Sequence, residues 1–252
     1  RLLQDMGYEV HVACNFRDGN TCDSKRIRKL RKMLFQMQVE CHQWECPRSI
    51  YSVRRCWAAY WQLWDLTGQY HYEWIHCHSP VGGALARIVA YGRHIGVIYT
   101  AHGFHFYKGA PFRNWLIYYP VEKLLSCLTD VLITVNKEDY YFAKNNLKAG
   151  KVCRIPGVGI HIEKYKNTPD GYIKSGQHIE KPGRKNKSME MRKKYGIPPD
   201  AKILLSVGEL SRRKNHREVI TALAGLVKQG ENVFYMICGQ GKLKERLMRY
   251  AK

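Results

Sequence analysis

The sequence alternates between short apolar segments and longer amphipathic ones along most of its length. The segments GVIYTA at 96–101 and DVLITV at 130–135 are apolar at consecutive positions, which is typical of strands that crossover helices bury on both faces of a parallel sheet. Strands and helices in this alternation predict an α/β fold built from βαβ units. In such sheets, ligands bind beyond the carboxyl ends of the strands.

Two series of βαβ units are expected, with a polar segment between them. Residues 1–160 form the first Rossmann-like domain, and residues 189–252 begin a second one. The segment 161–188 is a linker and surface loop, because its glycine, proline and lysine content cannot build a core. Expected strands lie at 8–14, 36–43, 73–77, 97–101, 130–134, 151–155, 202–207 and 232–238, and expected helices at 24–35, 50–66, 82–93, 112–128, 137–146, 189–195, 216–229 and 242–250.

Composition limits the partners and the compartment. The chain has 42 Lys and Arg residues against 21 acidic residues, a net charge of +21, which suits a phosphate, a nucleic acid or an anionic lipid surface. No apolar run approaches the roughly 20 residues that span a bilayer, and the N-terminal residues lack a signal-peptide pattern, so a cytoplasmic location is expected. Nine cysteines without a CxxC pair indicate reduced thiols rather than a disulfide framework.

Two clusters of histidine and cysteine invite a metal interpretation. Cys41, His42 and Cys46 form one, and the run from His76 to His78 forms the other. Neither has the paired spacing of a structural zinc site, so no metal is expected.

A histidine stands where such a fold places its ligands. His102 directly follows the apolar strand at 97–101, and Gly103 permits a tight turn that would leave the imidazole facing a cleft. An imidazole there can donate or accept a proton near neutral pH. A single histidine at a strand end is more often structural, so this position alone does not decide the function.

Two later strands each end in glycine. Gly208 follows the strand at 202–207 and precedes the basic run Arg212-Arg213-Lys214, and Gly239 and Gly241 follow the strand at 232–238. Glycine lets a ligand approach the backbone, and the cations and the helix N-terminus that follow suit a diphosphate. A solvated basic loop is the alternative.

Several segments in one order make the interpretation more specific. They are HCHSPVGGALAR, YTAHGFHFYKGAPFRNWLIYYPVEKLLS, TDVLITVNKEDYYFAK, IPGVGIHIEKY and SVGELSRRKNH. Together they resemble family-4 glycosyltransferases of the GT-B fold, particularly bacterial capsule and exopolysaccharide enzymes. The resemblance spans nearly the whole chain.

The resemblance implies a retaining hexosyltransferase that needs neither metal nor cofactor. Its co-substrate is a nucleotide sugar, expected to be a UDP-sugar, and its acceptor is a saccharide or a lipid-linked saccharide of the cell envelope. The acceptor lies on the N-terminal domain and the donor on the C-terminal one. His102 would lie beside the reacting sugar. The implied donor-binding residues are Gly208, Glu209, Arg213, Lys214, Gly239 and Gly241, and the implied cleft or acceptor residues are His78, Gly103, Thr134 and Asn136.

The chain departs from the family pattern in three ways. Glu209 stands where many relatives have arginine, which leaves phosphate binding to Arg212, Arg213 and Lys214. His161 stands where relatives usually have aspartate, in the hinge. The first strand with its glycine-rich loop and the paired-glutamate motif for the donor sugar are expected outside residues 1–252, so that the N-terminal domain lacks its first strand and the C-terminal domain is incomplete, and the fragment alone could be inactive.

Other features leave alternatives open. The basic segment 24–35 suits either a helix at the inner face of a membrane or an ordinary surface helix. Trp57, Tyr60, Trp61 and Trp64 have near-helical spacing and are expected in the core rather than on a sugar-stacking platform. The rival functions are a basic nucleic-acid-binding module, for which no motif is present, and a GT-B sugar-nucleotide epimerase.

Overall fold

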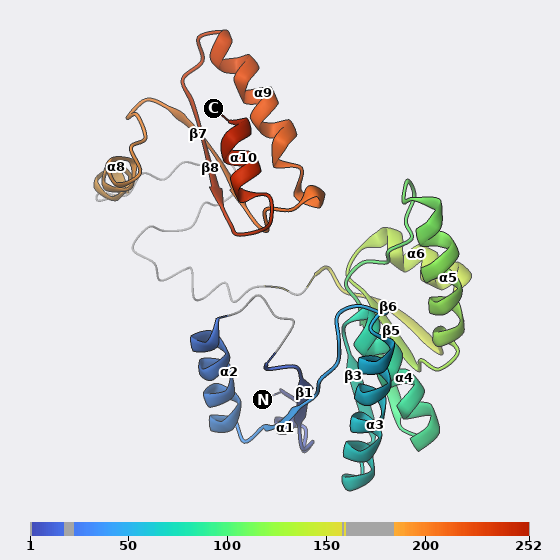
Figure 1. The fold of residues 1–252 in the computed structure, drawn as a ribbon. Helices are drawn as coiled ribbons and strands as arrows, with labels where there is room; N and C mark the ends of the chain where they lie inside the picture. The colour runs from blue at the N-terminus through green and yellow to red at the C-terminus, as the bar shows by residue number, and fades with distance from the viewer. Residues whose placement is uncertain (1, 18–22, 158, 160–183, 252) are drawn as a thin grey trace. The chain divides into compact units, whose positions relative to one another are not determined.

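A computed structural model describes residues 2–17, 23–157, 159 and 184–251 (Figure 1). The chain divides into two compact units, Arg1–Ile160 and His161–Lys252, and each is considered by itself. The prediction of an α/β fold with parallel sheets is confirmed, because every strand pair in both units is parallel. His161, expected in the hinge, lies outside the described residues.

The first unit contains two sheets. A four-stranded sheet has the order β3 (Trp74–Cys77), β4 (Gly96–Ala101), β5 (Val131–Thr134) and β6 (Lys151–Arg154). A second, two-stranded sheet pairs β1 (His11–Cys14) with β2 (Glu40–Gln43). The helices of this unit are α1 (Leu2–Asp5), α2 (Ser24–Gln36), α3 (Val53–Gln69), α4 (Pro80–Arg93), α5 (Phe112–Ser126) and α6 (Lys137–Asn146).

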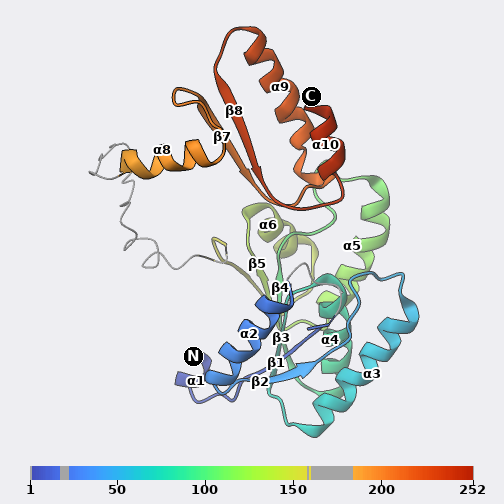
Figure 2. The same ribbon diagram turned by 60° about the vertical axis from the view of Figure 1, so that its left-hand side comes forward.

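The core of the first unit centres on β4. Val97, Tyr99 and Ala101 are 1–3% exposed, and they pack with residues of α4, β5 and α6 in one cluster. A side chain at Gly83 would lie 2.8 Å from the Tyr99 ring, so glycine there lets α4 pack closely on the strand. Helices α3 and α4 lie side by side, as both views show (Figures 1 and 2).

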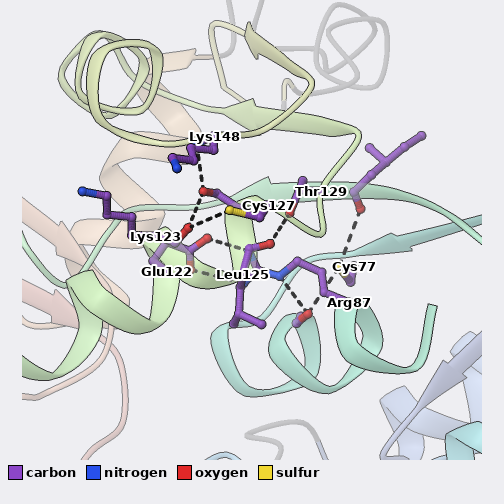
Figure 3. Close-up of polar contacts among 11 residues, drawn as sticks. Cys77, Arg87, Glu122, Lys123, Leu125, Cys127, Thr129 and Lys148 are labelled. Atoms are coloured by element: carbon purple, nitrogen blue, oxygen red, sulfur yellow. Dashed lines mark hydrogen bonds and ion pairs between the residues drawn. The ribbon is translucent and has the colours of Figure 1, made fainter. Parts of the chain in front are cut away.

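A buried ion pair joins α4 to α5. Arg87 is fully buried, and its guanidinium donates to both carboxylate oxygens of Glu122 at 2.7 and 3.2 Å (Figure 3). Arg87 also donates through Nε to the Gly83 carbonyl at 3.0 Å and stacks 4.1 Å from the centre of the Tyr99 ring. These contacts fix both helices against the strand that leads to His102.

Several bounds in the first unit differ from the sequence prediction, and so does the exposure of two tryptophans. The strand expected at 36–43 begins only at Glu40, because α2 continues to Gln36 and Gln38 then takes a left-handed φ of 55°. On α3, Tyr60 and Trp64 pack against the core as expected. Trp57 and Trp61 are 63% and 44% exposed, so the prediction of a core position was wrong for these two.

The second unit is a smaller α/β layer. Strand β7 (Lys202–Val207) pairs with β8 (Val233–Cys238), α9 (His216–Lys228) packs on β8, and α10 (Lys244–Tyr250) packs on α9 (Figures 1 and 2). The helix α8 (Arg184–Lys194) precedes them, and a 3-10 turn, η1 (Arg212–Lys214), leads into α9. Leu205 and Val207 are 60% and 77% exposed, so one face of β7 is not covered by the described residues.

Among the described residues, no helix combines the length and the apolar character that crossing a membrane requires.

Candidate functional site

Three histidines meet at the carboxyl ends of β3 and β4. The His76 ring lies 4.2 Å from the His78 ring between centroids, and His76 Nε2 lies 2.8 Å from the Thr100 hydroxyl. His102 Nε2 lies 3.4 Å from His78 Nδ1, and both side chains are exposed. His102 and His78, both predicted from the sequence, are therefore neighbours. His76 and Thr100 complete the cluster and were not among the predicted site residues.

Burial and neighbouring imidazoles change the pKa values of His76 and His78. Partial desolvation lowers the pKa of His76, and the charges of His78 and His102 lower it further. The pKa of His78 is lowered by desolvation and then by His102. Near neutral pH these two rings are therefore uncharged, and each can donate one hydrogen bond and accept one.

The turn after His102 is held by the start of α6. Gly103 has a left-handed φ of 141°, which favours glycine, and the next amide, of Phe104, donates to Asp139 Oδ2 at 3.3 Å. Asn136 caps α6, because its Oδ1 accepts from the Asp139 amide at 2.7 Å and its Nδ2 donates to Asp139 Oδ2 at 2.7 Å. Burial raises the pKa of Asp139. Asn136 thus positions the His102 turn through Asp139.

Thr134 differs from the other predicted cleft residues in its surroundings. It is fully buried at the end of β5, and its hydroxyl donates to the Cys153 carbonyl at 3.3 Å. Its side chain therefore supports the pairing of β5 with β6. A shallow hollow of about 410 Å³ lies beside α6 and β6, lined by Lys137, Tyr140, Tyr141, Val152, Cys153 and Arg154, and it contains none of the predicted site residues.

In the second unit, the loops after β7 and β8 lie against each other. The Gly208 amide donates to the Cys238 carbonyl at 3.0 Å, and the Leu210 amide donates to the Gln240 carbonyl at 2.9 Å. A Cβ on Gly239 would collide with the Gly208 carbonyl, and one on Gly241 would lie 2.5 Å from the Leu210 carbonyl oxygen. Both glycines are therefore required by this close approach of two backbones.

The basic turn lies over the first of these loops. A Cβ on Gly208 would lie 3.6 Å from Lys214 Cε, which places the lysine side chain across the glycine. Arg212, Arg213 and Lys214 are exposed on η1, and within the described part of the chain they form no ion pair. Gly208, Gly239 and Lys214 are thus brought together, and Gly241, Arg213 and the exposed Glu209 lie on the same two loops.

A buried histidine sits at the base of the basic turn and was missed by the sequence analysis. His216 is 5% exposed, and its Nδ1 lies 3.1 Å from the Tyr235 hydroxyl, which in turn lies 2.9 Å from the Ser206 hydroxyl. His216 Nε2 and Ser211 Oγ are buried without a hydrogen-bond partner in the described structure. Unpartnered buried groups of this kind are uncommon and suit a site that receives a polar ligand. The signal was present in SRRKNH, but only its charges were considered.

One further group of side chains could hold a metal ion. His11, Glu40 and His42 each offer a ligand atom, and these atoms lie within 4.8 Å of one another. Neither of the two cysteine-containing clusters considered from the sequence forms such a group in the described residues.

Comparison with known proteins connects both units to one class of enzyme. Residues 1–158 match the family model "Glycosyltransferase Family 4", and residues 187–252 match "Glycosyl transferases group 1". The chain is 36% identical over 260 residues to EpsD of Bacillus subtilis (strain 168), a protein described as a candidate glycosyltransferase. That alignment covers all of this chain and 59% of EpsD, so the chain spans less than two thirds of its relative.

Solved structures share the fold at low identity. HepE from Anabaena, crystallised with UDP-glucose, superposes with a TM-score of 0.63 at 13% identity, over 95% of this chain and 57% of HepE. Sucrose-phosphate synthase from Thermosynechococcus elongatus gives a TM-score of 0.58 at 15% identity, over 94% of this chain and 62% of the synthase. Both likenesses show a fold of the GT-B type. Because the family match extends over residues 1–158, the chain belongs to glycosyltransferase family 4.

Proposed function

We propose that the protein transfers a hexose from a UDP-sugar to a polysaccharide or lipid-linked acceptor of the cell envelope, with retention of anomeric configuration. The observation that carries the proposal is the paired-loop arrangement of the second unit, in which Lys214 lies over Gly208. Backbone, cations and a helix N-terminus meet there, and this combination suits a diphosphate. HepE, which shares the fold and was crystallised with UDP-glucose, is consistent with this donor.

Charge accounts for the catalytic role of the basic turn. When the glycosidic bond of the donor breaks, the departing nucleoside diphosphate gains negative charge. Lys214 and Arg213, which have no anionic partner within the described residues, are free to stabilise that charge. Fixed cations aimed at a developing charge lower the barrier, because the interaction is stronger in the transition state than in the ground state.

The cluster of His76, His78 and His102 in the first unit suits the binding of uncharged sugar hydroxyls. Sugar hydroxyls need partners that both donate and accept hydrogen bonds, and neutral imidazoles do both. His102 and His78 are exposed at the strand ends, where such a ring could contact donor or acceptor hydroxyls. The family assignment favours neither the epimerase nor the nucleic-acid-binding alternative.

Cellular location follows from the acceptor. A lipid-linked acceptor would be reached from the cytoplasm at the inner face of the membrane. Helix α2 supports such contact, because Leu30, Met33 and Phe35 are 41%, 48% and 81% exposed on a helix rich in lysine and arginine.

The experiment is to incubate the purified protein with a panel of nucleotide sugars and lipid-linked acceptors and to measure release of nucleoside diphosphate. Acceptor-dependent release is expected. Lys214→Ala should lower kcat/KM about 10²–10³-fold, and His102→Ala at least about tenfold. Lys228→Ala, an exposed lysine at the end of α9, and His71→Ala serve as matched controls. Unchanged rates in both site variants would show that these residues are not the site.

A further inference from the structure

The amino ends of β1 and β2 carry a second cluster of histidines, with different neighbours from the first. His11 and Glu40 are the first residues of their strands and are directly paired, and Ala13 is paired with His42. Paired residues of a parallel sheet share a face, and alternate residues of one strand do too. His11, Glu40 and His42 therefore project from the same face, and the small Ala13 leaves room beside the His42 ring.

The distances among these side chains match those around a metal ion. His42 Nε2 lies 3.1 Å from His11 Nδ1 and 3.6 Å from Glu40 Oε1, and one ligand atom from each of the three residues lies within 4.8 Å of the others. With bonds of about 2.0–2.2 Å, the ligand atoms of a tetrahedral zinc ion lie roughly 3.3–3.6 Å apart. The two spacings of His42 fall close to that range, so side-chain rotations would bring the three ligands onto one ion.

One ring nitrogen of the cluster, His11 Nδ1, lies within hydrogen-bond distance of two groups. A ring nitrogen carries either one hydrogen or one lone pair. His11 Nδ1 nevertheless faces both the Tyr72 hydroxyl at 2.7 Å and His42 Nε2 at 3.1 Å. A cation bound between His11 Nδ1 and His42 Nε2 would use both lone pairs at once, and the Tyr72 hydroxyl would turn away from His11 Nδ1.

The residues around the cluster have the character of a second coordination layer. Glu9 Oε1 lies 2.9 Å from His11 Nε2, and a carboxylate on the far nitrogen of a histidine is the usual support for a metal-bound imidazole. The Tyr70 hydroxyl donates to Glu40 Oε1 at 2.7 Å, and its ring meets that of His11 edge-on at 4.7 Å. The side chains of His11 and His42 are 6% and 17% exposed, so the two imidazoles are held in place, whereas the Glu40 side chain is 48% exposed.

The local charge also favours a divalent cation. Glu9 and Glu40 together carry two negative charges beside two imidazoles, and within the described residues neither carboxylate pairs with a lysine or an arginine. This is notable in a chain with a net charge of +21. One divalent ion would balance the two carboxylates.

We propose that His11, His42 and Glu40 supply three ligands of a site for a zinc-class divalent ion, with water as the fourth ligand. The ion ties β1 to β2 and, through the hydrogen bond from Tyr70 to Glu40, to the segment 70–72. Two imidazoles and one carboxylate suit zinc better than magnesium or calcium, which prefer oxygen ligands. The site lies on the two-stranded sheet of β1 and β2, whereas His78 and His102 follow β3 and β4 of the four-stranded sheet. It is therefore separate from the proposed transfer chemistry, which does not depend on it.

Zinc binding to the metal-stripped protein tests the proposal. Titration with Zn²⁺ should show one site that weakens at least about tenfold in His42→Asn and in Glu40→Gln. His71→Asn is the matched control, because His71 lies between Tyr70 and Tyr72 but is not part of the cluster. Zinc should also raise the melting temperature of the wild type and of His71→Asn, but not of the two cluster variants.

Cobalt distinguishes this site from adventitious binding by cysteines. Co²⁺ held by nitrogen and oxygen ligands should give visible absorption bands without a thiolate charge-transfer band in the near ultraviolet. This measurement on the wild type decides the question even if a cluster variant fails to fold. A thiolate band, equal zinc affinity in folded wild type and variants, or no binding at all would each overturn the proposal.

Discussion

Removing the carboxylate of Glu122 should strongly destabilise the first unit. The change Glu122→Ala leaves the guanidinium of Arg87, whose side chain is 1% exposed, without its anionic partner and without two hydrogen bonds of 2.7 and 3.2 Å. The Gly83 carbonyl and the Tyr99 ring remain in contact with Arg87, but neither carries a compensating charge. Breaking one side of a buried pair costs about 3–5 kcal/mol.

Urea unfolding followed by tryptophan fluorescence measures this loss of stability in the first unit of the protein. All six tryptophans lie between residues 44 and 115, so their emission reports on the first unit alone. With an m-value of about 2 kcal/mol/M, a loss of about 4 kcal/mol moves the urea midpoint down by about 2 M.

The double variant Arg87→Met/Glu122→Leu separates the charge from the packing. Replacing both partners with apolar residues of similar volume is often neutral, because the cost of desolvating two charges disappears along with their attraction. We expect the double variant to lie within about 1 kcal/mol of the wild type. A loss below about 1 kcal/mol in Glu122→Ala, as for an exposed pair, would refute the reasoning.

Three further predictions concern the loops after β7 and β8, the cluster of His76, His78 and His102, and the basic helix α2. Gly239→Ala should weaken UDP binding at least about tenfold in titration calorimetry, because the added methyl collides with the Gly208 carbonyl. Gly225→Ala is the control, because no atom lies within 4 Å of a Cβ at that position. Equal UDP affinity of Gly239→Ala and the wild type would contradict the close approach. Because the pKa values of His76 and His78 are lowered on folding, the unfolded chain binds protons first as pH falls below about 6.5, so the free energy of unfolding should fall there and not recover at lower pH. That dependence, measured by fluorescence, should be smaller in a His76→Asn/His78→Asn variant, and an equal slope would count against the shifts. Phe35→Ala should reduce co-sedimentation with anionic vesicles, because this ring is 81% exposed on α2, whereas unchanged binding would place the membrane contact elsewhere.

Local patterns were sufficient to predict the strands of the four-stranded sheet and the glycines after β7. The apolar run around Tyr99 requires burial on both faces, and the structure provides it. Glycine after a strand indicates a close backbone approach, which the Gly208 and Gly239 loops show. The start of β2 was not predictable in the same way, because the left-handed turn at Gln38 has no glycine to mark it.

Contacts between segments far apart in the sequence could not be predicted either. His11 and His42 are 31 residues apart, and only the register of β1 against β2 brings them together. From the sequence alone, His42 therefore groups with its chain neighbours Cys41 and Cys46. The buried position of His216 was missed for a similar reason, because its partner Tyr235 lies on the next strand.

The two histidine clusters of the first unit show how neighbours decide what an imidazole can do. Desolvation and then the neighbouring imidazoles lower the pKa values of His76 and His78, with no carboxylate among the causes, which keeps these two rings neutral and suited to sugar hydroxyls. His11 and His42 lie beside Glu9 and Glu40, whose charge favours a cation in place of a shared proton. We therefore expect the cluster after β3 and β4 to suit a neutral ligand and the cluster on β1 and β2 to suit a metal, and the difference lies in the carboxylates.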